Sequence, residues 1–273
     1  MKIMGMIAGN GRFPLIAARE ALHEGYRVVV CAIEGEADPQ LKKLVDAWIW
    51  VKIGQLKKLV KFFRAEGVRE AMMVGKIEKV RLFQENVSPD LEMIKVLMKT
   101  KNFKDDSLLL GIADYLFEEG IGLVDSTMFV KDLCPREGVM GKRKPSRDIL
   151  EDIQFGFDIA KSIAGLDIGQ TVVVKKKAVM AVEAIEGTDL AIKRGGRLGK
   201  DKVVVVKVAK PNQDMRFDVP AVGLKTLDEL ISVKAAAFAF EAEKTIFFDR
   251  DEFVKQANKH GIAIVGVKKA EKL

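Results

Sequence analysis

Cysteine and histidine are scarce in this chain, with only two of each among 273 residues. Two cysteines, Cys31 and Cys134, exclude a disulfide framework, and their wide separation excludes the clustered spacing of a zinc site. The histidines, His23 and His260, lie near the ends of expected helices, so no Ser–His–Asp or Cys–His catalytic arrangement can be assembled. Cys31 falls in an apolar run, where we expect a buried thiol.

Long apolar runs are also missing. The first apolar stretch, residues 1–8, is interrupted by glycine and is too short for the core of a signal peptide. No run approaches the length of a membrane span. We therefore expect a cytoplasmic protein.

The net charge is +7, from 46 basic and 39 acidic residues. The lysines are dispersed in pairs such as Lys42-Lys43, without the interleaved aromatic residues of a nucleic-acid-binding face. We expect no nucleic-acid partner. The basic excess has two interpretations: solvated surface lysine, or attraction to phosphorylated substrates or an acidic membrane surface.

Strand-like and helical segments alternate through residues 1–131. Short apolar or β-branched runs at 3–8, 26–33, 47–53, 70–74 and 121–125 are separated by segments with helical periodicity. This alternation predicts an α/β fold with a parallel sheet covered by helices. Sheets of this kind place ligands at the carboxyl ends of their strands.

Residues 132–145 differ in composition from the segments on either side, because prolines, glycines and basic residues occur there without apolar periodicity. We interpret them as a linker, with an ordered phosphate clamp as the alternative. Residues 146–273 form a second expected α/β domain. Its expected helices are 146–164, 226–232 and 251–260, and its expected strands are 171–175, 178–184, 203–208, 245–248 and 262–267.

The turn after the first strand contains Gly9, Asn10 and Gly11. Glycines there let backbone N–H groups approach an anion at the start of the next helix, where Pro14 suits the first turn. The turn does not match the dinucleotide-binding fingerprint GxGxxG, because Pro14 stands where the third glycine is required. A tight turn without a ligand is the alternative. Lys76 ends a later strand and either reaches a phosphate or serves as surface charge.

A second polar loop follows the strand at 178–184. It comprises Glu186, Gly187, Thr188 and Asp189. We expect these groups to face a ligand and to precede a helical stretch that ends near Arg194, Gly195 and Gly196. The alternative is that Thr188 or Asp189 only caps that helix.

The most informative segment is 210–220, directly after an apolar strand. Asp214, Arg216 and Asp218 alternate at period two, so an extended backbone would project them to one side. Two carboxylates there would hold Mg²⁺, and an arginine matches phosphate geometry. Lys210 and Gln213 add hydrogen-bond donors. The alternative is a solvated loop with an internal Asp–Arg pair.

Four motifs occur in order over nearly the whole chain: IAGNGRFP, DDSLLLGIADYLFEEGI, VEAIEGTDLAIKR and KPNQDMRFDVPAVGLKT. Together they resemble the UDP-2,3-diacylglucosamine pyrophosphatases of lipid A biosynthesis, the type unrelated to calcineurin-like hydrolases. The resemblance implies an N-terminal Rossmann-like domain linked to a distinct C-terminal domain, with substrate between them. It also implies hydrolysis to 2,3-diacylglucosamine 1-phosphate (lipid X) and UMP, with water attacking the α-phosphorus and Mg²⁺ (or Mn²⁺) required.

The catalytic aspartate of that family lies in a QDxRxDxP motif, which here offers Asp214 and Asp218. Both are carried over as catalytic and metal-binding candidates, with Arg216 stabilising charge on phosphorus. The predicted substrate-binding residues are Gly9, Asn10, Gly11, Lys76, Glu186, Gly187, Thr188, Asp189, Arg194, Lys210 and Gln213.

Two other functions compete with this prediction. A Rossmann-type oxidoreductase would need an acidic residue at the end of its second strand, where Glu34 could serve, but Pro14 in place of the third glycine argues against it. A non-catalytic nucleotide-binding module would use the same loops to bind a ligand without metal. Peripheral contact with the inner membrane and a homodimer are both left open.

Overall fold

The chain forms two compact units in a computed structural model that describes residues 1–77, 89–99, 105–217 and 219–268. Unit 1 contains Met1–Val130 together with the short later segment Asp214–Asp218, and unit 2 contains Lys131–Gln213 and Val219–Leu273. Residues 214–217 therefore belong with the N-terminal half of the chain, although their neighbours on both sides belong to unit 2.

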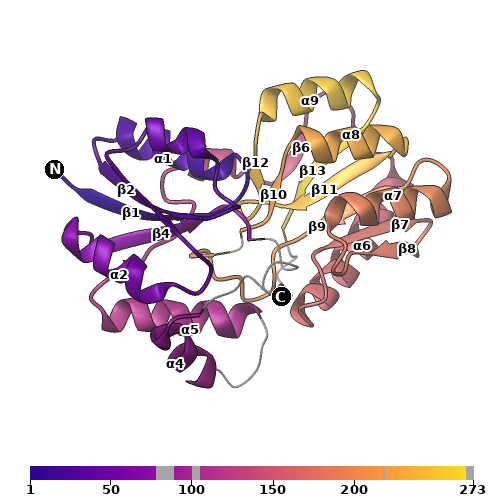
Figure 1. Cartoon of the computed structure of the whole chain (residues 1–273). Coiled ribbons are helices and arrows are strands. Elements are labelled where there is room, and N and C mark those ends of the chain that lie inside the picture. Colours follow the sequence, from indigo (N-terminus) through magenta and orange to yellow (C-terminus); the bar gives the residue numbers. More distant parts are fainter. Residues whose placement is uncertain (78–88, 100–104, 218, 269–273) are drawn as a thin grey trace, which may run out of the picture. The chain divides into compact units, whose positions relative to one another are not determined.

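Unit 1 is a five-stranded parallel sheet in the order β3-β2-β1-β4-β5. Figure 1 shows α1 on one face of this sheet, with α2 and α5 on the other. The direction of strand order reverses between β1 and β4, as in Rossmann-like folds, which confirms the predicted architecture. Its elements are β1 (Ile3–Ala8), α1 (Phe13–His23), β2 (Arg27–Ile33), a 3₁₀ turn (Pro39–Lys43), β3 (Ala47–Val51), α2 (Leu56–Ala65), β4 (Glu70–Val74), α4 (Leu91–Lys99), α5 (Asp105–Glu118) and β5 (Gly122–Leu123).

The core of unit 1 follows from the patterns of β2 and α2. Leu59, Val60 and Phe63 lie on one stripe of α2 and are buried in a cluster with Cys31 and Leu116. Full burial of a side chain such as Phe63 contributes about 2–3 kcal/mol. Cys31 is buried, which confirms the expected buried thiol, and this burial raises the pKa of the thiol.

Unit 2 is a six-stranded mixed sheet in the order β6-β13-β11-β9-β7-β8, with a separate pair of β10 and β12. Helix α6 packs on one face of the large sheet, and α7, α8 and α9 pack on the other. Its elements are a 3₁₀ turn (Lys131–Leu133), β6 (Gly138–Met140), α6 (Arg147–Gly165), β7 (Thr171–Lys175), β8 (Ala178–Val182), α7 (Thr188–Gly199), β9 (Val204–Lys207), β10 (Ala221–Val222), α8 (Leu224–Ser232), β11 (Ala237–Glu241), β12 (Ile246–Phe247), α9 (Arg250–Lys259) and β13 (Ala263–Val267). Among the described helices of both units, none is long and apolar enough to cross a membrane.

Residues 132–145, which the sequence suggests as a linker, lie in unit 2. Within them, β6 pairs antiparallel with β13 at the edge of the large sheet. The next helix begins as expected, because the Ser146 hydroxyl accepts a hydrogen bond from the Ile149 N–H at 3.4 Å.

Strand β11 has no counterpart among the expected elements, although it lies inside the sheet between β9 and β13. Its alanines favour a helix locally. In the sheet, Ala237 and Ala239 face the cluster under α6, and Phe238 and Phe240 face the opposite cluster. Burial on both faces overrides the local preference.

Helix α7 does not end at Gly195 and Gly196, so that expectation is wrong. The two glycines let the helix approach its neighbours closely. A Cβ atom at Gly195 would lie 2.5 Å from Val173 Cβ, and one at Gly196 would lie 2.3 Å from Val233 Cβ. Gly195 and Gly196 therefore lie inside the helix, where they allow close packing against Val173 and Val233.

Candidate functional site

The carboxyl ends of β1 and β4 are joined by backbone hydrogen bonds at the point where strand order reverses. The Gly9 N–H donates to the Val74 carbonyl at 2.8 Å, and Asn10 and Lys76 exchange two bonds of 2.7 and 3.0 Å. A Cβ at Gly9 would lie 2.5 Å from the Lys76 oxygen. Gly75 has a φ of +89°, and its Cβ would lie 2.7 Å from the Asn10 oxygen. Both glycines are required by close backbone contact, at the edge where such sheets bind ligands.

Helix α1 begins directly after this turn. Its N-cap residue, Arg12, makes no side-chain capping hydrogen bond, and Pro14 occupies the first turn as expected. Gly11 has a φ of +98° and is exposed. The structure shows the tight turn that both interpretations require, and its role in holding an anion stays a prediction.

Ser126 attaches residues 214–217 to the same edge of the sheet. The side chain is 0% exposed, and its Oγ lies 2.6 Å from the carbonyl oxygens of both Met73, in β4, and Arg216. The single hydroxyl proton is donated to one of them at a time. The Ser126 N–H also donates to the Met215 carbonyl at 2.9 Å. Residues 214–217, with the predicted catalytic residues Asp214 and Arg216, are thus positioned beside the end of β4.

Residues 214–217 form a turn, so the predicted extended ribbon is wrong. The Phe217 N–H donates to the Asp214 carbonyl at 3.3 Å, and the Arg216 N–H donates to Asp214 Oδ1 at 3.0 Å. An aspartate side chain that accepts from the backbone two residues later favours a turn over a strand. Asp218 lies outside the described residues.

Asp214 and Arg216 form a two-pronged ion pair. Arg216 Nε lies 2.9 Å from Asp214 Oδ1, and Nη2 lies 2.6 Å from Oδ2. These bonds hold the pKa of the Asp214 carboxyl below its ordinary value, against the effect of partial burial. They also raise the pKa of Arg216, and the charge of Asp114 on α5 adds to that effect. Arg216 further lies over the Phe217 ring, 5.5 Å from its centroid. The pair is charged at neutral pH and held in one orientation.

The Asp214 carboxylate in this turn is a suitable type of ligand for a magnesium ion. Carboxylate oxygens are the ligands Mg²⁺ prefers. The backbone N–H, Nε and Nη2 of Arg216 already point at the Asp214 carboxylate, which offers about four lone-pair sites. A metal at Asp214 would therefore bind beside Arg216 or replace one of its bonds. Among the described residues, no group of three or more His, Cys, Asp or Glu gathers to hold a metal.

The predicted loop of unit 2 is ordered by its own side chains. Glu186 pairs with Arg194, which also donates to the Val182 carbonyl at 2.8 Å. The bond from Arg194 holds the pKa of Glu186 below its ordinary value. The N-cap residue of α7 is Gly187, with a φ of +84°. The alternative that Thr188 or Asp189 caps this helix is therefore wrong.

Thr188 and Asp189 instead connect α7 to other elements of unit 2. The Thr188 hydroxyl lies 2.9 Å from Glu183 Oε1 and accepts from Lys207 Nζ at 2.7 Å. Lys207 is 5% exposed, at the carboxyl end of β9. Asp189 accepts from the Thr226 hydroxyl at 3.2 Å. These hydrogen bonds hold the start of α7 beside the carboxyl end of β9.

Lys210 and Gln213 also lie in unit 2. Lys210 is 8% exposed, and its Nζ lies 2.7 Å from Asp167 Oδ1. The Lys210 N–H donates to Gln213 Oε1 at 3.2 Å. The structure thus brings Lys210 and Gln213 together, and their expected role as substrate-binding donors stays a prediction.

Two residues of these arrangements were missed in the sequence, although each left a signal. Ser126 follows a short strand in the polar run Asp125-Ser126-Thr127, and Lys207 is the charged residue within VVVVKVA. A polar residue at the carboxyl end of a buried strand is expected to have a specific partner. The partners themselves are distant in sequence.

Two family models match the chain: LpxI N-terminal domain over residues 3–133 and LpxI C-terminal domain over residues 136–265. A protein of Caulobacter vibrioides named UDP-2,3-diacylglucosamine pyrophosphatase LpxI is 30% identical over 283 aligned positions, which cover 100% of both chains.

Solved structures resemble the chain only weakly. N5-carboxyaminoimidazole ribonucleotide synthetase from Thermotoga maritima is 16% identical with a TM-score of 0.28, and the match covers 69% of this chain and 43% of that one. The biotin carboxylase domain of Hydrogenobacter thermophilus 2-oxoglutarate carboxylase is 12% identical with a TM-score of 0.28, covering 72% and 41%. This chain spans less than half of either structure, and similarity at this level supports no functional argument.

Proposed function

Because the chain belongs to the LpxI family, we propose that it hydrolyses the pyrophosphate bond of UDP-2,3-diacylglucosamine with Mg²⁺ (or Mn²⁺). Water attacks the α-phosphorus, and the products are UMP and 2,3-diacylglucosamine 1-phosphate. The proposal is supported by full-length agreement with a relative of that activity. The main structural support is that Ser126 attaches the Asp214 and Arg216 turn to the end of β4, at the edge of unit 1 where the strand order reverses.

Arg216 is the group proposed to stabilise charge on the phosphorus. Its Nε and Nη2 bind Asp214, which fixes the guanidinium plane, and the proposed donor to a pyrophosphate oxygen is Nη1. A donor positioned before the reaction does not reorganise when charge develops, and such donors contribute about 10²–10³ in rate. Asp214 thus orients Arg216 as well as serving as a candidate for direct chemistry.

Asp214 and Asp218 are the candidates for holding the metal and for orienting the attacking water, one role each. A bound Mg²⁺ would polarise the phosphoryl oxygens and lower the pKa of a coordinated water. Because Asp214 remains ionised at neutral pH, it can accept a hydrogen bond from that water.

The turn of Gly9, Asn10 and Gly11 is proposed to hold the pyrophosphate at the start of α1. Lys76, bonded through its backbone to Asn10, adds a cation at the same edge. The proposed substrate contacts from unit 2 are Glu186, Gly187, Thr188, Asp189, Arg194, Lys210 and Gln213.

Release of UMP from UDP-2,3-diacylglucosamine tests the reaction directly. The purified full chain should release UMP with Mg²⁺, lose activity with a chelator and regain it when Mg²⁺ is restored. Asp214→Asn should lower kcat/KM by about 10²–10³. The matched control is Asp201→Asn, because Asp201 also pairs with a cation, Lys175, at 3.0 Å, but on the exposed surface of unit 2.

The proposal fails if the wild-type chain releases no UMP. If Asp214→Asn and Asp218→Asn both keep wild-type activity, the family reaction stands and the site assignment is wrong. Binding of the substrate without turnover would support the non-catalytic alternative, and quenching of nicotinamide fluorescence would support the oxidoreductase. The homodimer stays a prediction.

A further inference from the structure

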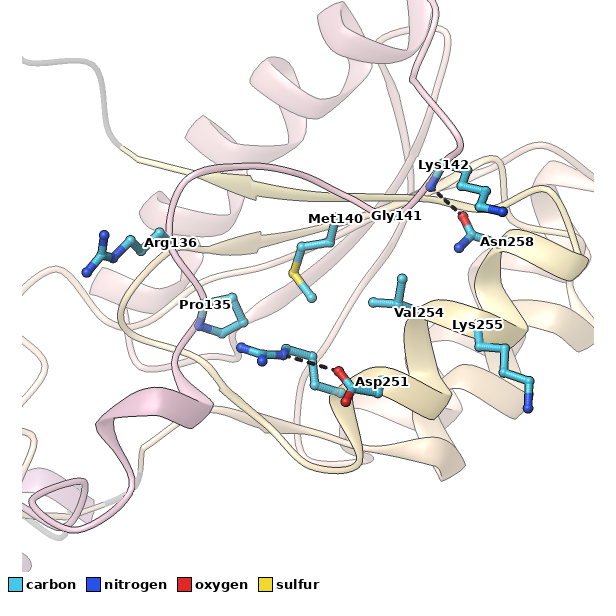
Figure 2. Close-up of a pocket in the computed structure, with 10 residues that line it drawn as sticks. Pro135, Arg136, Met140, Gly141, Lys142, Asp251, Val254, Lys255 and Asn258 are labelled. Atoms are coloured by element: carbon cyan, nitrogen blue, oxygen red, sulfur yellow. Dashed lines mark hydrogen bonds and ion pairs between the residues drawn. The ribbon is translucent and has the colours of Figure 1, made fainter.

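Unit 2 has a groove of about 640 Å³ between the segment around β6 and one side of α9. Figure 2 shows Met140 and Val254 pointing into it, beside Pro135. This apolar floor is surrounded by longer polar and charged side chains. None of the candidate catalytic or substrate-binding residues that the structure describes lines the groove.

The wall of the groove is held in place by close packing. Gly141 has a φ of +91°, and a Cβ there would lie 2.9 Å from Val254 Cγ1 and 2.8 Å from Asn258 Oδ1. Asn258 Oδ1 also accepts a hydrogen bond from the Lys142 N–H at 2.7 Å. The segment after β6 is thus bonded to α9, so the groove is a defined surface feature.

The rim of the groove is strongly basic. Its cations are Arg136, Lys142, Arg250 and Lys255, and exposed Arg143 and Lys144 continue the cluster along the chain. The acids beside these cations are Asp251, whose Oδ1 lies 3.8 Å from Arg250 Nε, Glu252, whose Oε2 lies 3.3 Å from Lys255 Nζ, and Glu137, which follows Arg136 in the chain. In the part of the chain that the structure describes, Arg136, Lys142, Arg143 and Lys144 form no ion pair. Because these four cations form no ion pair with the described residues, they repel one another and the two paired cations beside them, and an anionic surface relieves that repulsion.

We infer that this basic groove docks unit 2 onto a bilayer surface rich in anionic lipid. Clusters of about four to eight Lys and Arg are attracted to such surfaces. The apolar floor suits the glycerol and upper acyl region of a lipid between phosphates bound at the rim. A nucleic acid would be expected to use aromatic side chains for stacking, and no aromatic residue lines the groove.

Vesicle flotation of the full chain tests this surface. Wild-type protein should float with vesicles of phosphatidylcholine and phosphatidylglycerol but remain behind with phosphatidylcholine alone. Binding should weaken as the ionic strength rises, because screening shortens the reach of surface charge. Each cation near an anionic surface contributes about fivefold to partitioning. Neutralising the four rim cations (R136Q, K142Q, R250Q, K255Q) should therefore lower the partition coefficient by about 10²-fold or more.

The matched control neutralises four exposed lysines of unit 1 (K42Q, K43Q, K57Q, K61Q), so the net charge falls by the same four units. It should keep most of the binding. The double variant K142Q/K255Q retains Arg250, which donates to the Asp132 carbonyl at 3.4 Å, and should still lose about 25-fold. A melting curve confirms that each variant is folded.

Equal loss in the rim and control variants would overturn the inference, because net charge alone would then explain binding. Failure of wild-type protein to float with anionic vesicles would also overturn it. Binding of an RNA oligonucleotide that needs the same four cations, without vesicle binding, would reject the lipid assignment. None of these outcomes depends on pyrophosphatase activity.

Discussion

Removal of the Ser126 hydroxyl tests whether the turn at 214–217 is held by the sheet of unit 1. Ser126→Ala leaves the carbonyl oxygens of Met73 and Arg216 without a donor that lies 2.6 Å from each, at a position with 0% exposure. Loss of a buried hydrogen-bond partner costs about 1–3 kcal/mol in unfolding free energy. The Ser126 N–H still donates to Met215, so the turn should loosen without detaching.

The stability of unit 1 can be read separately from that of unit 2. Both tryptophans, Trp48 and Trp50, lie in β3 of unit 1, so tryptophan fluorescence during urea unfolding reports this unit alone. We expect Ser126→Ala to lower its unfolding free energy by about 1–3 kcal/mol. A displacement of about 1 Å at a reacting group can cost up to about 10²-fold, so UMP release should fall by about 10- to 100-fold.

The control is Ser162→Ala, which removes an exposed hydroxyl that donates to the Asp158 carbonyl at 2.9 Å. Because Ser162 lies in unit 2, the stability of this variant is followed by circular dichroism, which reports both units, and it should change by less than about 0.5 kcal/mol with activity unchanged. If Ser126→Ala also left both quantities unchanged, the hydroxyl would not hold the turn. A loss of stability with full activity would show that the turn is structural and lies outside the reaction site.

Three further predictions follow from the same unit. Arg216→Lys should lower kcat/KM by about 10- to 100-fold, because an ammonium cannot bridge both Asp214 oxygens as the guanidinium does; steady-state UMP release measures it. Gly75→Ala should destabilise unit 1 by about 1–3 kcal/mol more than Gly25→Ala, as measured by urea unfolding. Both glycines have a positive φ, but only at Gly75 would an added Cβ meet backbone, 2.7 Å from the Asn10 oxygen. The Asp214 pKa lies below its ordinary 3.8, so its pairing stabilises the fold fully above about pH 4 and less as the pH falls through the lower, folded pKa. The difference in unfolding free energy between wild type and Asp214→Asn, from urea unfolding, should be about 0.5–1 kcal/mol for this partly exposed pair. It should shrink as the pH falls below about 4, and a constant difference would contradict the ion pair.

The alternation of apolar strands and amphipathic helices was sufficient to predict two α/β domains, because each element carries its own periodicity. Ser146 at the start of α6 and Pro14 in the first turn of α1 were also readable, since capping depends on neighbouring residues. Strand β11 was not readable, because its alanines form a strand only when both faces are buried. Gly195 and Gly196 likewise signal an ending locally and a close contact in space.

For the site, the sequence by itself determined which residues are rich in chemistry: the glycine turn, the EGTD loop and the Asp–Arg–Asp segment. Their chemistry depends on side-chain type and short spacing, which the sequence contains. Only the tertiary structure decided that Asp214 folds back onto Arg216, and that Ser126, 90 positions before Arg216, attaches this turn to the end of β4. The physical reason is that a hydrogen bond between residues distant in sequence depends on how the whole chain folds. Local sequence patterns do not specify which distant segments will meet.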